Sequence, residues 1–245
     1  MTRTATRLTG EIVRSAGIPV ADRAAMCALM AAAFRDFDPV RFERDLAEKP
    51  WAILLRDAAG SIAGFSTLDL MTACIDGRVV RAVYSGDTII AARHRVTTAL
   101  PRAFLRFLAQ HTTMAADPAN WFWFYVCKGF RTYRFLPLFY RNFHPHPHRA
   151  TPDFERKVMD GLARRRFGSD YDAATGVVRV AGDYALADAA GLTPGRMADP
   201  FIRLFATRNP GWPRGDELVC LARLEFHNFL ERPRRWLEEE IEAVP

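Results

Sequence analysis

Cysteine is scarce in this sequence, and the cysteines are far apart. The four stand singly, without any Cys-x-x-Cys spacing, at Cys27, Cys74, Cys127 and Cys220. Zinc sites and disulfide frameworks depend on paired or regularly spaced thiols. The sequence therefore predicts neither, and we expect the cysteines to serve as small apolar side chains of the core.

Long apolar runs are lacking as well. No stretch of about 18 apolar residues is available to span a bilayer, and the segment MTRTATRLTG lacks the apolar centre of a secretory signal. We therefore expect a soluble, cytoplasmic protein without a transmembrane segment. With 245 residues and 49% hydrophobic content, the chain suffices for one large domain, or for a domain with an added subdomain.

Lysine is almost absent, occurring only at Lys49, Lys128 and Lys157. Arginine thus carries most of the positive charge, and the formal net charge of +6 permits an anionic partner such as nucleic acid, a membrane surface or a phosphorylated cofactor. Arg156 and Arg164 to Arg166 form a basic helix face, but no nucleic-acid reading motif accompanies it. We interpret this face as solvated and expect no nucleic-acid partner.

Several signature motifs of enzymes are missing too. The sequence has no Gly-x-Ser-x-Gly, no P-loop and no Gly-x-Gly-x-x-Gly, which argues against a serine hydrolase, a nucleotide hydrolase and a dinucleotide-dependent enzyme. His144, His146 and His148 alternate with prolines as in a metal-binding tract. An exposed, proline-stiffened loop explains them without a ligand set, so we expect no metal.

Hydrophobic periodicity predicts an α/β chain of two helices, three antiparallel strands, a helix, a buried strand and a further helix. The helices are expected at Asp22 to Phe34, Pro39 to Leu46, Thr98 to Thr112 and Tyr133 to Phe143, and the strands at Trp51 to Arg56, Ser61 to Met71, Val79 to Ile90 and Trp121 to Val126. Later elements are a helix at Pro152 to Phe167, a short strand at Gly176 to Val180, a loop from Leu186 to Arg208 with a short helix near Phe201, a strand at Glu217 to Phe226 and a terminal helix at Arg234 to Ala243.

The stretch VYSGDTIIAARHR, from Val83 to Arg95, interrupts a strand with Ser85, Gly86 and Asp87. Glycine packs nothing inside a strand, and a buried carboxylate needs a partner. A glycine at such a position is typical of a β-bulge or of a close backbone approach. The interruption therefore indicates a function rather than a contribution to stability.

The order of elements resembles the GCN5-related N-acetyltransferase (GNAT) fold. In that fold helices precede an antiparallel meander, and a strand-loop-helix unit holds acyl-coenzyme A. The resemblance covers about Ala21 to Phe143 and implies a mixed, mostly antiparallel sheet flanked by helices. It divides the chain into a GNAT-like core over residues 1–150 and a C-terminal extension over 151–245 that completes the sheet.

The resemblance also implies where the coenzyme binds. Family members have an Arg/Gln-x-x-Gly-x-Gly/Ala loop whose backbone N–H groups hold the pyrophosphate at a helix start. The matching segment is RVTTAL, from Arg95, in which Thr98 and Leu100 replace small residues. Either Arg93, His94 and Arg95 compensate with charge while Thr97 or Thr98 caps the helix, which we favour, or the site is degenerate and coenzyme A binds weakly or not at all.

Further roles follow from the same resemblance. The backbone at Ser85, Gly86 and Thr88 would form a bulge that faces the thioester. Asp87 would be a general base with a pKa raised by burial, or alternatively a surface partner of an arginine. Tyr133 or Tyr140 would protonate the departing thiolate, although a tyrosine in apolar surroundings is also an ordinary core residue. Substrate contacts are expected from Tyr84 and from Lys128, which a basic turn explains equally well.

We therefore expect an acyltransferase that moves an acyl group from acyl-coenzyme A to an amine or hydroxyl of a small molecule. The attack on the thioester would be direct, without a covalent enzyme intermediate, and a homodimer is compatible with the sequence. The alternative is a non-catalytic binding or regulatory module that has kept the fold and lost or weakened coenzyme A binding.

Overall fold

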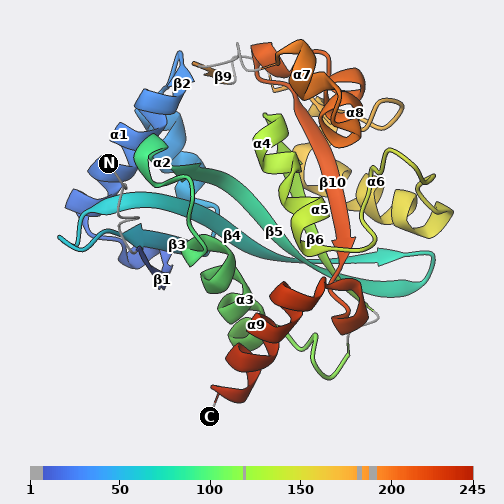
Figure 1. The fold of residues 1–245 in the computed structure, drawn as a ribbon, viewed down its shortest axis with the longest axis horizontal. Helices are drawn as coiled ribbons and strands as arrows, with labels where there is room; N and C mark the ends of the chain where they lie inside the picture. The colour runs from blue at the N-terminus through green and yellow to red at the C-terminus, as the bar shows by residue number, and fades with distance from the viewer. Residues whose placement is uncertain (1–7, 118–119, 181–183, 188–191, 245) are drawn as a thin grey trace.

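The computed structural model describes residues 8–117, 120–180, 184–187 and 192–244. Their main feature is an eight-stranded sheet in the order β1-β3-β4-β5-β6-β10-β8-β7 (Figure 1). The strands are β1 (Thr9–Arg14), β3 (Trp51–Arg56), β4 (Ile62–Ile75), β5 (Arg78–Ile90), β6 (Trp121–Cys127), β10 (Glu217–Arg223), β8 (Val177–Val178) and β7 (Tyr171–Asp172). Neighbouring strands are antiparallel except for β5 and β6, which are parallel. The predicted mixed, mostly antiparallel sheet is confirmed.

Helices cover both faces of this sheet. They are α1 (Val20–Ala33), α2 (Pro39–Ala47), α3 (Ala99–His111), α4 (Phe130–Tyr133), α5 (Phe135–Phe139), α6 (Asp153–Phe167), α7 (Pro194–Met197), α8 (Pro200–Arg208) and α9 (Glu231–Glu242). A second, two-stranded sheet joins β2 (Phe34–Arg35) to β9 (Ala185–Leu186). Among the described residues no helix is both long and apolar enough to cross a membrane.

One face of the sheet packs on α3 and α9, which lie side by side in Figure 1. Phe104, Phe107 and Leu108 of α3 and Leu237 of α9 belong to one buried cluster with strand residues such as Val83. The repeat of apolar side chains on α3 at helical spacing dictates this contact. The face beneath β5 is therefore closed by an apolar helix layer.

The opposite face is covered by two separate groups of helices. Met26 of α1 and Phe42 of α2 pack on Leu54 and Phe65 of β3 and β4. Leu162 of α6 belongs to a different cluster, with strand residues of β5, β6 and β10. The covering helices are thus divided between the two halves of the sheet, α1 and α2 over one and α6 over the other.

Two of the sequence predictions need correction. The helix expected from Tyr133 to Phe143 is wrong beyond Phe139, where α5 ends. Buried residues at helical spacing suggested a continuous helix, but the chain after Phe139 is extended, with bridges from Tyr140 to Phe229 and from His144 to Leu221. The last strand ends at Arg223, three residues early, and a 3-10 turn follows.

Other elements were missed or shortened. Strand β1 was not anticipated, because TGEIVR has no clear alternation; it pairs along the whole of β3. The strand expected at Gly176 to Val180 is reduced to the two residues of β8. Within the expected loop from Leu186 to Arg208, α8 is the short helix near Phe201 and α7 precedes it, while residues 188–191 lie outside the described part.

Candidate functional site

The site begins where the two parallel strands separate. Strands β5 and β6 pair from Arg81 opposite Trp121 to Ser85 opposite Tyr125. Beyond this rung β5 continues along β4, and β6 continues along β10. Because backbone groups of a sheet interior lose their ladder partners at such a divergence, this point offers polar groups in the centre of the fold.

A β-bulge in β5 lies at the same point. The register between β4 and β5 passes from Ser66 opposite Thr88 to Leu68 opposite Ser85, so that Thr67 faces two residues, Gly86 and Asp87. The bulge inferred from the glycine is confirmed.

Gly86 is required there by close neighbours. A Cβ atom at this position would lie 2.7 Å from Thr67 Oγ1 and 3.0 Å from Lys49 Cε. The Thr88 hydroxyl donates to the Gly86 carbonyl at 3.2 Å and shares a hydrogen bond of 2.8 Å with Ser66 Oγ. The bulge is thus held by side chains on both strands.

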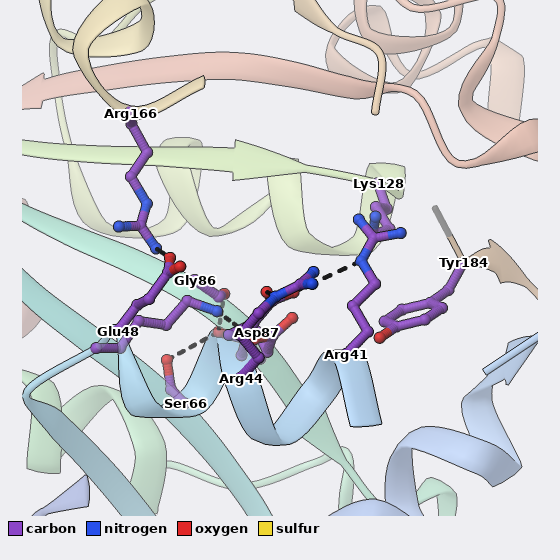
Figure 2. Close-up of polar contacts among 12 residues, drawn as sticks. Arg41, Arg44, Glu48, Ser66, Gly86, Asp87, Lys128, Arg166 and Tyr184 are labelled. Atoms are coloured by element: carbon purple, nitrogen blue, oxygen red, sulfur yellow. Dashed lines mark hydrogen bonds and ion pairs between the residues drawn. The ribbon is translucent and has the colours of Figure 1, made fainter. Parts of the chain in front are cut away.

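Asp87 leaves the bulge on the side of α2 and meets a buried lysine. Its Oδ2 atom accepts a hydrogen bond of 2.6 Å from Lys49 Nζ, and the Lys49 side chain is only 6% exposed (Figure 2). Burial acts to raise the pKa of Asp87, but the charge and hydrogen bond of Lys49, together with the charge of Lys128, outweigh it and lower the pKa. The raised pKa expected for this carboxyl is wrong.

A cleft of about 820 Å³ opens above the bulge on this face, between the α2 side and the α6 side of the molecule. We call it the main cleft. Its described lining holds seven basic and four acidic side chains; these are Arg41, Arg44, Lys49, Arg95, Lys128, Arg131 and Arg166, with Asp45, Glu48, Asp87 and Glu217. Figure 2 shows members of this set reaching toward one another from α2, β5, the end of β6 and α6.

A second opening lies on the α3 face of the sheet. It is an apolar cavity of about 50 Å³ lined by residues of β5, β6, α3 and α5, and it shares Gly86 and Thr88 with the main cleft. Ser85 and Trp123 form part of its wall, where the indole Nε1 donates to Ser85 Oγ at 2.9 Å. The bulge therefore borders both a polar cleft and an apolar cavity, which also share Val126, Thr132 and Phe135.

Tyr140 also lines the apolar cavity. Its side chain is 2% exposed, and its hydroxyl has no hydrogen-bond partner among the described residues. Burial raises the pKa of Tyr140 well above its usual range, so the hydroxyl keeps its proton at every physiological pH. A protonated, unpartnered hydroxyl beside a cavity is available to donate to a bound group.

Tyr133 lies elsewhere. Its hydroxyl donates to the Pro145 carbonyl at 2.7 Å, and its ring packs against Phe143 and Phe205 in the core. The Tyr133 side chain belongs to neither the main cleft nor the apolar cavity. Of the two candidate acids, the structure brings Tyr140 and not Tyr133 to the site.

The loop before α3 is only partly directed toward the site. Arg95 lines the main cleft. Arg93 instead donates from Nε to His94 Nε2 at 2.9 Å and lies 3.9 Å from Asp57. The expected set of three side chains is thus split, with Arg95 alone of the three on the cleft wall.

The start of α3 has reduced capacity to bind an anion through its backbone. Thr97 Oγ1 accepts from the Ala99 N–H at 3.1 Å, whereas Thr98, the N-cap residue, makes no side-chain capping bond. Pro101 has no N–H to offer. Of the two threonines expected to cap this helix, Thr97 does so, and its bond occupies a backbone donor at the helix start.

The two expected substrate contacts both lie on the main cleft. Lys128 Nζ lies 3.4 Å from Glu217 Oε1, with both side chains less than 15% exposed. Tyr84 is buried beneath the guanidinium of Arg166, whose Cζ lies 5.1 Å from the ring centroid. Burial raises the pKa of Tyr84 above its usual range.

Sequence reasoning missed Lys49 and the arginines of α2. Lys49 follows α2 and is far from β5 in the chain, so its contact with Asp87 arises from the tertiary fold. One signal was present: the chain has only three lysines, and two of them, Lys49 and Lys128, line the main cleft.

The order of helices and strands defines the class of fold. Helices precede an antiparallel meander, and the bulged strand β5 leads through a loop and α3 into the parallel strand β6. This is the element order of the GNAT fold, so the resemblance indicated by the sequence is confirmed at the level of the fold. Neither a protein-family model nor a curated protein matches the chain.

Solved structures of this class share parts of the fold at low sequence identity. A protein of Enterococcus faecalis described as a probable N-acyltransferase is 13% identical, with a TM-score of 0.40 over 55% of this chain; the match spans 33% of that protein's length. The GNAT family N-acetyltransferase YhbS from Escherichia coli, in complex with CoA, is 15% identical, with a TM-score of 0.35 over 54% of this chain and 68% of that one. A GCN5-related N-acetyltransferase from Sphaerobacter thermophilus is 13% identical, with a TM-score of 0.34 over 95% of this chain and 91% of that one.

Proposed function

We propose that this chain is a divergent member of the GNAT superfamily that transfers an acyl group from acyl-coenzyme A to a small-molecule acceptor in the cytoplasm. The observation that carries the proposal is the position of the bulge. Gly86 and Thr88 border both the main cleft and the apolar cavity. A donor and an acceptor held in these two spaces would meet at one backbone segment.

In this proposal the thioester lies at the bulge against the apolar cavity, the rest of the coenzyme lies along the Arg95 side of the main cleft, and the acceptor enters the main cleft from the α2 side. The acceptor nitrogen or oxygen forms a bond to the thioester carbonyl carbon, the carbon–sulfur bond breaks, and the sulfur leaves with the electron pair. The Tyr140 hydroxyl donates a hydrogen bond to this sulfur and so stabilises the departing thiolate, for which an unpartnered, protonated hydroxyl at the cavity wall is suited. Backbone N–H groups of the bulge stabilise the negative charge on the carbonyl oxygen.

Asp87 has a different role from the one expected of a base. A carboxylate whose pKa is lowered binds protons weakly near neutrality, so it serves poorly as a proton acceptor. An ionised carboxylate at the bulge is suited to orienting the acceptor through a hydrogen bond. We therefore propose that Asp87 positions the acceptor and that the acceptor's proton leaves through water in the main cleft.

Coenzyme binding is proposed to depend on side-chain charge more than on backbone N–H groups. Arg95 on the cleft wall and the helix dipole of α3 remain available at the loop, whereas the Ala99 N–H is occupied by Thr97. Coenzyme affinity should then be strongly dependent on salt concentration, because contacts between exposed charges are screened.

Calorimetric titration of the full chain with acetyl-, malonyl- and long-chain acyl-coenzyme A tests the proposal, with thiol release measured in the presence of amines. We expect binding of at least one donor and a release rate that falls about 100-fold in Tyr140→Phe. A folded protein that binds none of the three would overturn the proposal.

The second candidate is a binding or regulatory module without transfer activity. The reduced capacity of the α3 start, with Pro101 in its first turn, is the observation that favours it. Binding of coenzyme A without thiol release from any acyl-coenzyme A, over a broad panel of amines and alcohols, is the result that supports this candidate.

A further inference from the structure

We propose that the acceptor is an anion: a small molecule that carries a carboxylate or a phosphate in addition to its nucleophilic group. This inference rests on the proposed function, because it concerns the acceptor of that reaction. The evidence for an anion-binding site comes from the charge of the main cleft. The described residues that line the main cleft have a net charge of +3, from seven basic and four acidic side chains.

Two of the four acidic side chains of the main cleft pair with its two buried lysines. Asp87 pairs with Lys49 at 2.6 Å and Glu217 with Lys128 at 3.4 Å. Every cation and anion of these two pairs is less than a quarter exposed. Within each pair the two charges neutralise one another, since a charge buried without a partner would be costly.

The excess positive charge therefore lies with the arginines nearer the solvent. The other two acidic side chains contact arginines of the lining. Asp45 lies 3.7 Å from Arg41 Nε through Oδ2 and 3.6 Å from Arg44 Nε through Oδ1, and Glu48 Oε2 lies 3.7 Å from Arg166 Nη2. Arg44 is 69% exposed, and Arg95 and Arg131 are exposed on the same lining. Three exposed arginines around one concave opening produce a positive potential that is focused into it.

Arginine is also the residue type that recognises oxyanions. A guanidinium presents paired N–H donors that match carboxylate and phosphate oxygens, and it keeps its charge at all relevant pH values. Arg44 lies on α2, the helix that directly precedes Lys49, and Arg131 lies on α4, directly after the end of β6. Both residues line the main cleft, and Figure 2 labels Arg44 among the residues of this lining.

The phosphates of the coenzyme are the other source of the same chemistry. Arg95 belongs to the loop before α3, where the coenzyme is proposed to lie, so Arg95 alone does not distinguish the two. Arg44 and Arg131 come from other elements of the fold, α2 and α4. We therefore assign the preference for an anionic acceptor to Arg44 and Arg131, and the test substitutes these two residues.

Equilibrium binding separates the inference from the proposed activity. The full chain is titrated in a calorimeter with two matched pairs of amines, in which one member differs by a carboxylate (lysine and cadaverine) or by a phosphate (O-phosphoethanolamine and ethanolamine). We expect the acidic member of at least one pair to bind at least about tenfold more tightly. The pair that shows the difference identifies the anion as carboxylate or phosphate.

The variants Arg44→Gln and Arg131→Gln should each reduce this ratio about tenfold, whereas Arg203→Gln, on the exposed surface of α8 outside the main cleft, should leave it unchanged. Equal binding of acidic and neutral members would overturn the inference. So would a loss of coenzyme A affinity in both variants with the acceptor ratio unchanged, because the arginines would then serve the coenzyme. If the chain binds coenzyme A and releases thiol but shows no preference for the acidic amines, the anion site is wrong and the proposed function stands. If it binds the acidic amines more tightly but binds no coenzyme A, the anion site stands and the proposed function is wrong.

Discussion

Lys49 Nζ lies 2.6 Å from Asp87 Oδ2, and the same separation joins Lys157 Nζ to Asp76 Oδ2 on the surface. The two ion pairs differ in burial. The Lys49 side chain is 6% exposed and that of Lys157 is 56% exposed. Water compensates the remaining charge when one partner of an exposed pair is removed, but not when the pair is buried. Loss of the lysine should therefore destabilise the fold more at the buried pair than at the exposed pair, although the two distances are equal.

We expect Lys49→Met to lower the free energy of unfolding by about 2–4 kcal/mol at neutral pH, and Lys157→Met to lower it by less than about 1 kcal/mol. Urea denaturation of both variants gives the comparison.

The pH dependence of the Lys49→Met effect adds a check. The lowered pKa of Asp87 contributes stability above the unfolded pKa of 3.8 and loses it as pH falls through the folded pKa. The difference between wild type and Lys49→Met should therefore shrink in acid. Equal effects of the two lysine substitutions, or a constant difference at low pH, would contradict this account of the pair.

Gly86→Ala tests the close approach at the bulge. The new Cβ would lie 2.7 Å from Thr67 Oγ1 and 3.0 Å from Lys49 Cε. We expect a loss of about 1–3 kcal/mol in unfolding free energy from overpacking. Gly17→Ala is the control, because a Cβ there meets no atom within 4 Å. A Gly86→Ala variant as stable as Gly17→Ala would show that the bulge tolerates a side chain.

Tyr140 and Tyr133 give opposite expectations for the same substitution. Tyr140→Phe removes a buried hydroxyl without a partner, so stability should be unchanged or should rise by up to about 1 kcal/mol. Tyr133→Phe removes the hydrogen bond to the Pro145 carbonyl and should cost about 1–3 kcal/mol. Thiol release should fall only in Tyr140→Phe. If activity followed Tyr133 instead, the assignment of the thiolate-stabilising hydroxyl to Tyr140 would be wrong.

His144 predicts a loss of stability in mild acid. Burial lowers the pKa of His144 from 6.5 to about 4, so the unfolded chain binds a proton that the folded chain refuses. The free energy of unfolding should therefore fall as pH drops from about 6.5 to about 4. NMR titration of the imidazole, with stability measurements on wild type and His144→Gln, checks both parts. An imidazole that titrates near 6.5 would refute the explanation.

Much of the architecture around the site was open to prediction because its signals are local. The glycine between Ser85 and Asp87 indicated the bulge, and the order of helices and strands indicated the fold. The aromatic run from Trp121 predicted a buried strand, which β6 confirms. Each of these features depends on the spacing of residues within one element.

The remainder depended on contacts between distant segments. The pairing of Asp87 with Lys49 reversed the expected direction of its pKa, and no spacing within β5 reports a residue that follows α2. Tyr133 and Tyr140 have similar local sequence, yet one hydroxyl bonds to the Pro145 carbonyl and the other reaches a cavity. The apolar residues beyond Phe139 are at helical spacing and indicated a helix. The prediction was wrong because an extended chain buries the same residues.

Trp123 provides a direct reporter for the central claim, that the thioester of acyl-coenzyme A lies against the apolar cavity at the divergence of β5 and β6. Its indole lies on the cavity wall and donates to Ser85 Oγ at 2.9 Å. The measurement is the tryptophan fluorescence of the full chain during titration with acetyl-coenzyme A, repeated with Trp123→Phe. The account predicts a saturable change in the wild type that is largely lost in the variant. No saturable change, or a change that Trp123→Phe leaves intact, would contradict it.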